Sequence, residues 1–307
     1  MKLIKTFFTI GCALIYATAF AQDNLPSHYL ANPLFLNPAY TGGSEGITTS
    51  LNHLNNFGRY HRNHTTFLST DIPIEKVKGG FGILLSLDAN YLLLKRTAGL
   101  SYAYGFRINE NLSLRAGAVL DYLNYKMDDE QFNQTYYPYS TIDKQQSIDI
   151  SGGFLLSGKQ FSIGSAIHHI NEPDMGMIRN PASSIPYENL LQRRLIINGT
   201  YTFSTPRLKI SPHFLFSAQG AAQNLMLGVY VDRGPFYLGG NISHTNIREW
   251  GDAISVLIGG RYKGFNLGYS YGITVSTLHL RNAYASHEIF LRKSFAPKKD
   301  RKQSVVH

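Results

Sequence analysis

Near its C-terminus the chain carries the triplet Ser286-His287-Glu288, which combines the nucleophile, base and acid types of a serine hydrolase. The residues around the triplet alternate apolar with polar side chains, a pattern that predicts a β-strand. Neighbouring residues of a strand point to opposite faces, so Ser286 and His287 cannot pair as nucleophile and base. The alternation places His287 on one face and Ser286 with Glu288 on the other. We therefore expect a structural role for the triplet and predict no catalytic residue and no enzymatic activity.

Two other clusters have the chemistry of metal ligands. His168 and His169 precede Glu172 and Asp174, and the acidic stretch 128–130 reads Asp-Asp-Glu. Neither cluster has a recognised metal-ligand spacing. The first begins at the end of an expected strand and the second falls between two, where polar residues are exposed in any case. We predict no metal site and no cofactor.

The elements that would position these residues are short and numerous. Roughly fourteen segments of about eight to twelve residues alternate apolar with small or polar side chains. A transmembrane strand of an outer-membrane barrel needs about 9–11 tilted residues with an apolar outer face and a polar inner face. We therefore predict an all-β fold, an integral outer-membrane antiparallel β-barrel of about 14 strands. The expected strands are 47–55, 63–71, 80–89, 97–107, 111–123, 147–157, 160–168, 192–203, 207–217, 223–232, 236–244, 252–262, 264–274 and 285–295.

Charges and link lengths agree with this interpretation. In bacterial barrels the periplasmic turns are short and the extracellular loops are longer. With both mature termini in the periplasm, every second link from the fourth strand onward is a short turn, whereas 124–146 and 169–191 stand out as long outer loops. Six charged residues of the expected strands also fall on the polar inner face, where a lumen tolerates them. These inner charges are Arg107, Arg115, Asp121, Asp149, Asp232 and Arg261.

The two ends of the chain differ from the strands. Residues 1–21 predict a secretory signal peptide with cleavage after Ala21, and the chain's single cysteine, Cys12, lies inside it. No other apolar run approaches the length of a membrane-spanning helix. The full-chain charge is +9, and the segment 296–307 forms a basic tail. Because an exported protein seldom meets nucleic acid, we expect this charge to favour lipid head groups or an acidic protein partner, or simply to solubilise the end of the chain.

Residues 22–46 do not alternate and are predicted to form a non-strand segment before the barrel 47–295. The dipeptides Asn32-Pro33 and Asn37-Pro38 favour extended or turn geometry. The segment is interpreted as an inserted plug, a docking strand or an ordered periplasmic lead-in to the first strand. Its apolar residues favour packing into or under the barrel over a solvated tail.

Four sequence landmarks, in order over nearly the whole chain, resemble those of the PorP/SprF family of Bacteroidota outer-membrane proteins. The first landmark holds Asn32, Pro33, Asn37, Pro38, Ala39, Tyr40 and Gly42. The second is Lys78-Gly79-Gly80-Phe81-Gly82, and the third includes Tyr269-Ser270-Tyr271. The fourth is Ala285-Ser286-His287-Glu288-Ile289, followed by the aromatic Phe295 that closes the last strand. Gly272 and Ala285 depart from the family pattern, which has aspartate and glycine at those places.

The resemblance implies a barrel similar to the fatty-acid-transporter type and a non-enzymatic component of the type IX secretion system, the export route linked to gliding motility. It also implies three kinds of partner: secreted cargo proteins with C-terminal sorting domains, such as adhesins, other secretion-system components, and outer-membrane lipid. One alternative remains open on the residues alone, an outer-membrane channel for hydrophobic or small solutes. A barrel enzyme acting on lipids would need a serine, a histidine and an acid on one inner face, and the sequence offers no such set.

Overall fold

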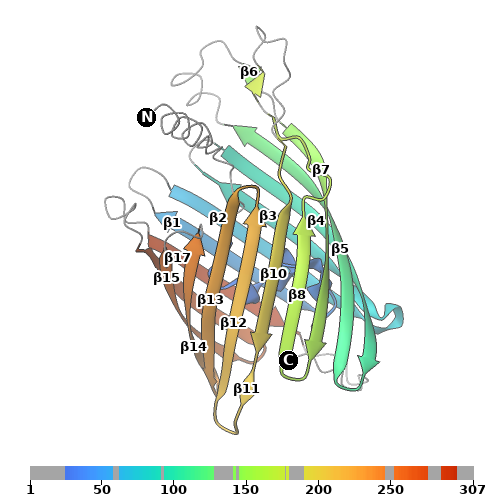
Figure 1. Ribbon diagram of the computed structural model, residues 1–307, viewed down its shortest axis with the longest axis vertical. Helices are drawn as coiled ribbons and strands as arrows, with labels where there is room; N and C mark the ends of the chain where they lie inside the picture. Colours follow the sequence, from blue (N-terminus) through green and yellow to red (C-terminus); the bar gives the residue numbers. More distant parts are fainter. Residues whose placement is uncertain are drawn as a thin grey trace, which may run out of the picture.

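The computed structural model describes residues 25–57, 62–90, 93–127, 141–142, 145–176, 178–179, 190–245, 252–275 and 285–295 (Figure 1). Several features predicted above lie outside these residues. They are the signal peptide with its cleavage site after Ala21, the single cysteine Cys12, the acidic stretch 128–130 and the basic tail 296–307.

Nearly all described residues after the first twenty-odd belong to antiparallel strands. The long strands are β1 (Thr48–Phe57), β2 (Arg62–Ile74), β3 (Gly79–Ala89), β4 (Leu93–Asn109), β5 (Leu112–Met127), β7 (Gln145–Gly158), β8 (Phe161–His168), β10 (Arg194–Tyr201), β12 (Lys209–Gln219), β13 (Ala222–Arg233), β14 (Phe236–Thr245), β15 (Ala253–Tyr262), β16 (Phe265–Thr274) and β17 (Ala285–Ser294). Each corresponds to one expected strand. The largest differences in a boundary are at β4, which begins about four residues earlier than expected, and at β5, which ends about four residues later.

The main sheet closes on itself. Its fifteen strands include the two-residue β11 (Phe203–Ser204), and the other fourteen form a ring because β1 pairs with β17 and β10 pairs with β12. A closed antiparallel barrel of fourteen strands is therefore confirmed. A second, two-stranded sheet pairs β6 (Thr141–Ile142) with β9 (Ile178–Arg179) and so joins the two long loops to each other.

The two ends of the barrel have different links. We call the end that holds the start of β1 and the end of β17 the turn end, and the opposite end the loop end. The loop end carries the links 128–144 and 169–193. Two links depart from the expected alternation of short turns and longer loops. The 220–221 link at the loop end has only two residues. The 202–208 link at the turn end is longer, because β11 folds back on β12.

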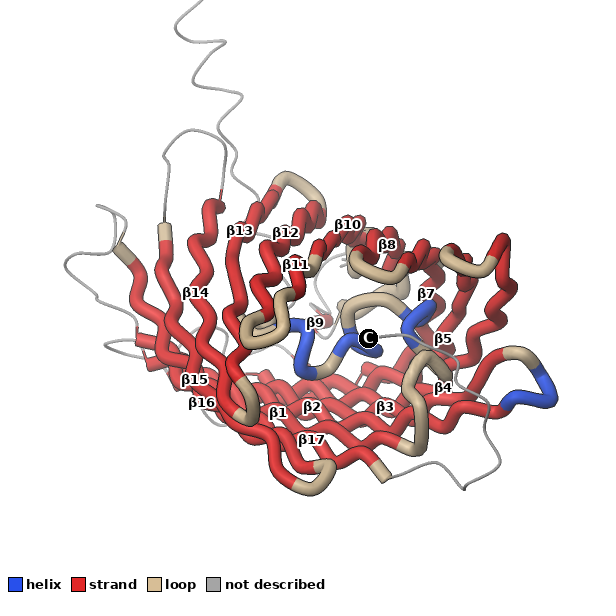
Figure 2. The backbone as a smooth tube through the Cα atoms, turned by 90° about the horizontal axis from the view of Figure 1, so that it is seen from below, coloured by secondary structure: helices blue, strands red, loops and turns tan. Residues whose placement is uncertain are grey.

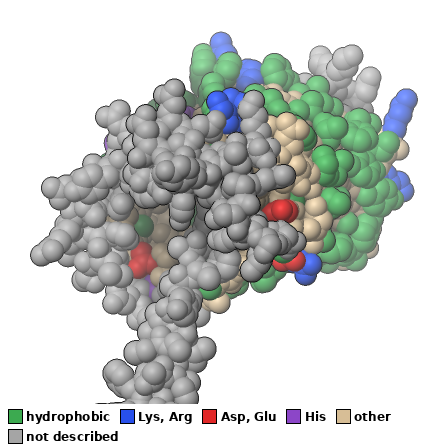
Figure 3. Space-filling model, turned by 90° about the horizontal axis from the view of Figure 1, so that it is seen from above, with side chains coloured by type: hydrophobic (Ala, Val, Ile, Leu, Met, Phe, Trp, Pro, Cys, Tyr) green, Lys and Arg blue, Asp and Glu red, His purple; other side chains and the backbone are tan. Residues whose placement is uncertain are grey.

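Alternate residues divide between two chemically different faces. The outer face exposes large apolar side chains such as Phe236 (69 % exposed) and Leu100 (68 %), whereas the inner face buries polar ones such as Asp149 (1 %). Seen from the loop end, hydrophobic side chains cover much of the outer wall (Figure 3). An apolar band outside and polar groups inside are what a lipid-embedded barrel requires. In the part of the chain that the structure describes, no helix is long and apolar enough to cross a membrane.

The chain that precedes β1 lies inside the ring of strands (Figure 2). We call residues 25–46 the inner segment. It contains three short 3-10 helices, η1 (Tyr29–Ala31), η2 (Pro33–Phe35) and η3 (Pro38–Tyr40), whereas η4 (Glu75–Val77) lies in the turn between β2 and β3. Prolines begin η2 and η3 because their fixed φ suits the first helical position and their missing N–H leaves no donor unpaired there.

Candidate functional site

The most fully paired polar group of the inner segment is Asn37, whose side chain is completely buried. Its Nδ2 donates to the carbonyl oxygens of Phe154 on β7 (2.9 Å) and Ser165 on β8 (3.2 Å). Its Oδ1 accepts from the Ala39 backbone N–H (2.8 Å) and thereby caps η3. One asparagine thus shapes the local turn and fixes it to two strands of the wall, which explains why this residue type precedes the proline.

The other asparagine of the double Asn-Pro motif is also anchored to the wall. Asn32 is 3 % exposed, and its Oδ1 accepts from the Ser69 hydroxyl on β2 at 2.5 Å. Farther along, Thr41 Oγ1 is hydrogen-bonded with Ser101 Oγ on β4 at 2.8 Å. The segment is therefore tied by side-chain hydrogen bonds to strands on several sides of the lumen.

A buried carboxylate and a half-buried guanidinium hold the segment where it leaves the lumen at the turn end. Asp71 on β2 is 2 % exposed; its carboxylate accepts from the Gly42 N–H and from the Ser44 N–H (3.2 Å). Arg115 on β5 donates to the Ala39 carbonyl through Nε (3.1 Å) and to the Thr41 carbonyl through its guanidinium. Charge-assisted hydrogen bonds of this kind are the stronger ones, so they fix the path into β1.

The strands that pack against the segment present glycines to it. A Cβ at Gly117 on β5 would lie 2.4 Å from the Pro38 carbonyl carbon, and one at Gly153 on β7 would lie 2.3 Å from Asn37 Oδ1. At the exit, Gly42 has a φ of +69°, and its Cβ would lie 2.5 Å from the Gly80 nitrogen of β3. Only glycine leaves room for a chain at this distance. The first and second sequence landmarks therefore meet at Gly42 and Gly80.

The beginning of the segment is anchored by the last landmark of the chain. Glu288 on β17 is 1 % exposed; its Oε2 accepts from Ser27 Oγ (2.8 Å) and from the His28 N–H (3.2 Å). Its Oε1 accepts from Asn52 Nδ2 on β1 (3.3 Å). Ser270 Oγ on β16 is hydrogen-bonded with Ser27 Oγ at 2.9 Å. The glutamate of the apparent hydrolase triplet thus binds the chain's own N-terminal segment.

His28 sits among aromatic side chains. Its ring lies 4.5 Å from the Phe290 ring, and its Nδ1 is hydrogen-bonded with the Tyr230 hydroxyl at 2.7 Å. Burial lowers the pKa of the imidazole from 6.5 to about 3, with smaller contributions from His213 and from two arginines of the wall. His28 is therefore neutral in the docked segment. The two arginines are Arg261 and Arg292.

The aromatic and imidazole side chains of the last two landmarks lie on the outer face. Tyr269 Oη is hydrogen-bonded with His287 Nδ1 at 2.6 Å, and the Tyr271 ring packs edge-on against His287 at 5.1 Å. Ile289 is half exposed, and the Phe295 N–H donates to the Ile47 carbonyl (2.9 Å), which joins the two ends of the barrel. His287 is thus separated by the wall from its sequence neighbours Ser286 and Glu288, and the triplet forms no nucleophile–base pair.

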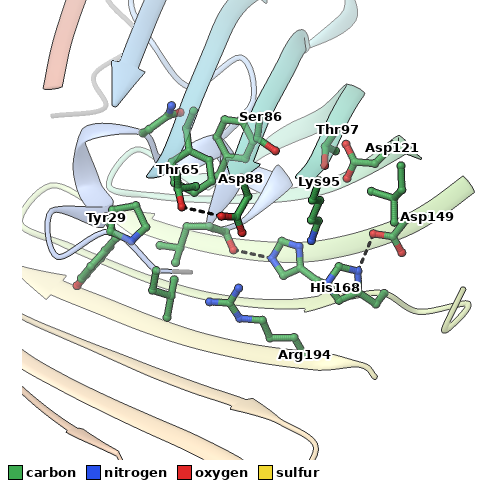
Figure 4. A pocket seen from close by; sticks show the side chains of 18 residues that line it. Tyr29, Thr65, Ser86, Asp88, Lys95, Thr97, Asp121, Asp149, His168 and Arg194 are labelled. Carbon is green, nitrogen blue, oxygen red and sulfur yellow. Dashed lines mark hydrogen bonds and ion pairs between the residues drawn. The ribbon is translucent and has the colours of Figure 1, made fainter. Parts of the chain in front are cut away.

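The inner segment leaves two cavities toward the loop end. One, of about 110 Å³, is lined by charged side chains from several strands and by Tyr29 and Leu36 of the segment (Figure 4). The charged and ionisable lining residues are Asp88, Lys95, Asp121, Asp149, His168, His169 and Arg194. The other, of about 340 Å³, is lined mainly by asparagines, serines and small residues, Ser286 among them.

The histidines that suggested metal chemistry have other partners at this cavity. His168 Nε2 is hydrogen-bonded with the Leu36 carbonyl (3.0 Å), and His169 Nδ1 pairs with the buried Asp149 carboxylate (2.7 Å). His169 has a φ of 57°, which turns the chain sharply after β8. Glu172 pairs with Arg193 instead (3.3 Å), and among the described residues no group of three or more His, Cys, Asp or Glu is arranged to hold a metal.

Several residues of this site carry no local sequence signal. The inward charge of Arg115 was visible in the alternation, but Asp71, Ser69, Asn198 and Asn241 look like ordinary inner-face residues. Asn198 Nδ2 donates to the Tyr40 hydroxyl (2.8 Å), and Asn241 Nδ2 donates to the Ser27 carbonyl (2.7 Å). An inner-face asparagine or aspartate in a strand rich in apolar residues is the available hint, because such a group needs a partner in the lumen.

Comparisons with known proteins agree with this architecture. A family model described as type IX secretion system membrane protein PorP/SprF matches residues 18–292. No curated protein matches the chain.

Among solved structures, the toluene transporter TbuX of Ralstonia pickettii is 11 % identical and has a TM-score of 0.56, with 86 % of this chain and 94 % of that chain covered. The deltaS2 mutant of TodX, a monoaromatic hydrocarbon channel, is 8 % identical with a TM-score of 0.53, covering 87 % and 95 %. A Pseudomonas aeruginosa FadL homologue is 12 % identical with a TM-score of 0.49, covering 92 % and 96 %. At these identities the likeness concerns the fold.

Proposed function

Because the chain belongs to the PorP/SprF family of type IX secretion system membrane proteins, we propose that it is a non-enzymatic outer-membrane component that aids the export or surface attachment of particular cargo proteins. The cargo would be proteins with C-terminal sorting domains, adhesins and gliding-linked proteins among them. The observation that supports a docking role over a transport role is the inner segment, which is hydrogen-bonded to strands around the whole lumen.

The loop end would be the cargo side. By the rule that short turns face the periplasm, the long loops 128–144 and 169–193 face outward. Backbone pairing of β6 with β9 joins the two loops at these residues. The turn end and the basic tail 296–307 would contact other secretion-system components, and residues 1–21 would direct export and be cleaved after Ala21.

The runner-up function is an outer-membrane channel for hydrophobic or small solutes. It is favoured by the two cavities at the loop end and by the fold shared with TbuX and TodX, whose names refer to toluene and monoaromatic hydrocarbons. The chemistry of the lining is less favourable for such substrates. Carboxylates, a lysine and an arginine stand beside apolar side chains such as Phe35 and Phe67 in the smaller cavity. Amides and hydroxyls interrupt the apolar lining of the larger one, so neither cavity offers an aromatic hydrocarbon a wholly apolar wall.

The deciding experiment is deletion of the gene in its host, followed by proteomics of the medium and the cell surface. We expect loss of one or a few exported proteins with C-terminal sorting domains while the others persist. Complementation with the unaltered gene should restore them, and complementation with 128–144 replaced by a short turn should not. An unchanged exoproteome after deletion would contradict the proposal.

A second measurement addresses the channel function directly. In planar bilayers the unaltered barrel should show no steady conductance, because the inner segment packs across the turn-side half of the lumen. A variant lacking residues 25–43 should conduct. Steady conductance of the unaltered barrel would favour the channel.

A further inference from the structure

The neighbouring strands β2, β3, β4 and β5 form one stretch of the barrel wall (Figure 2). On its outer side this stretch has a hollow of about 520 Å³. Two rows of paired residues line it. The row nearer the loop end is Thr66, Leu87, Arg96 and Asn124, and the row nearer the turn end is Leu68, Leu85, Ala98 and Tyr122. Each row crosses all four strands, a width of roughly 14 Å at about 4.8 Å between strands.

The hollow faces away from the lumen. Leu85, Leu87 and Tyr122 are more than 40 % exposed, while the residues that follow or precede them, such as Leu84 and Leu123, are buried on the inner face. The depth has a simple cause. Ala98 stands between Leu85 and Tyr122 in its row, and its methyl group leaves the space that a larger side chain would fill.

The two rows differ in polarity. Arg96 carries an exposed guanidinium, Asn124 adds an amide, and Thr66 adds a hydroxyl that is hydrogen-bonded with His53 Nδ1 at 2.9 Å. No carboxylate stands in either row. Toward the turn end the wall is apolar, because the next row is Thr70, Ile83, Leu100 and Leu120. The hollow therefore has a cationic, hydrogen-bonding rim above an apolar floor.

We propose that this hollow binds one lipid of the leaflet at the loop end, with an acidic head group beside Arg96 and an acyl chain along Ala98. The position in the wall determines the class of occupant, since a depression in a lipid-facing surface is filled by lipid. The polarity determines its orientation and charge: a phosphate or other acidic group pairs with the guanidinium, and the chain extends over Leu100 toward the turn end. This site is independent of the secretion role.

The test uses the purified full-length barrel and native mass spectrometry. The barrel is equilibrated with phosphatidylglycerol and phosphatidylcholine in equal amounts, and the retained lipid is counted. The unaltered barrel should retain one phosphatidylglycerol in preference to phosphatidylcholine. Arg96→Gln should lower that preference about tenfold, the effect expected for one charge-assisted hydrogen bond. Ala98→Phe, which fills the hollow without changing the charge, should lower retention of both lipids.

The matched control is Lys159→Gln, which removes an exposed cation from the turn between β7 and β8, at the turn end and away from the hollow. It should leave the preference unchanged. Every variant is first shown to keep the heat-modifiable migration of a folded barrel. Equal losses in Arg96→Gln and Lys159→Gln would overturn the proposal in favour of unspecific surface attraction. Full retention of lipid by Ala98→Phe would overturn it as well.

Discussion

The two halves of the lumen are built differently. Toward the turn end the inner segment packs against glycines, and its asparagines and backbone groups are paired with the wall. Toward the loop end the same ring of strands encloses two cavities lined by charged and amide side chains. The difference shows which half is fixed. Close packing leaves one arrangement of the turn-side half, whereas the loop-side half keeps space in which contacts can change.

The largest effect on stability is expected from a substitution that places a side chain where the inner segment packs against the wall. Gly153→Val places a branched side chain where a Cβ alone would lie 2.3 Å from Asn37 Oδ1. We expect a loss of about 3 kcal/mol in the free energy of unfolding, or expulsion of the inner segment, as for an overpacked core. Denaturant unfolding in detergent and bilayer conductance measure the two results.

The neighbouring Gly152 supplies the matched control. It belongs to the same strand but faces outward, and a Cβ there would meet its nearest atom at 3.7 Å, an ordinary contact. Gly152→Val should therefore leave stability within about 0.5 kcal/mol. Equal destabilisation by the two substitutions would mean that the strand, and not the inner segment, is sensitive to bulk.

The next largest effect concerns the anchor of the segment. Glu288→Ala removes the acceptor of Ser27, His28 and Asn52, and it should cost about 2–3 kcal/mol because these buried donors lose their partner. Ala31→Cys, at a position 3 % exposed, reports release of the segment through labelling by a water-soluble maleimide.

Labelling of this cysteine should be slow in the unaltered background and fast with Glu288→Ala. Ser286→Ala is the control, because Ser286 lies two residues away on the same inner face but lines the loop-side cavity instead. It should leave labelling slow. Protection that persists in Glu288→Ala would show that the glutamate does not hold the segment.

The sequence predicted the barrel, but it did not predict the contact between the N-terminal segment and the last strand. Strand alternation is local, so fourteen strands and the inner placement of Arg115 and Asp149 followed from spacing alone. The contact of Glu288 with Ser27 joins residues 261 positions apart, and no periodicity encodes such a pair. The double Asn-Pro motif marked the segment as irregular, yet the glycines that receive it, such as Gly117, look like any small residue of a strand.

A smaller effect is expected from acidification, which should weaken docking of the inner segment through protonation of His28. Docked His28 has a pKa of about 3, against 6.5 for a free imidazole. The released segment therefore binds more protons between these values, and docking is fully stable above pH 6.5 and weakens as the pH falls toward 3. At pH 5 the loss is about 2 kcal/mol.

Maleimide labelling at Ala31→Cys, corrected for the thiolate fraction, should become faster from pH 7.5 to pH 5. His28→Gln keeps a hydrogen-bonding group beside Tyr230 but cannot be protonated in this range, so its labelling should not change with pH. A pH response that survives in His28→Gln would assign the effect to another group.

The smallest effect is expected in the loop-side half. Asp149→Asn removes a buried charge beside His169 but keeps an oxygen for the imidazole, so the loss of stability should be about 1 kcal/mol. The inner segment should stay docked, because its hydrogen bonds to β7 are made by the Phe154 carbonyl and not by Asp149. Slow labelling at Ala31→Cys together with a small decrease in the free energy of unfolding would show that the loop-side half adapts without disturbing the packed half. Fast labelling would mean that both halves respond as one unit.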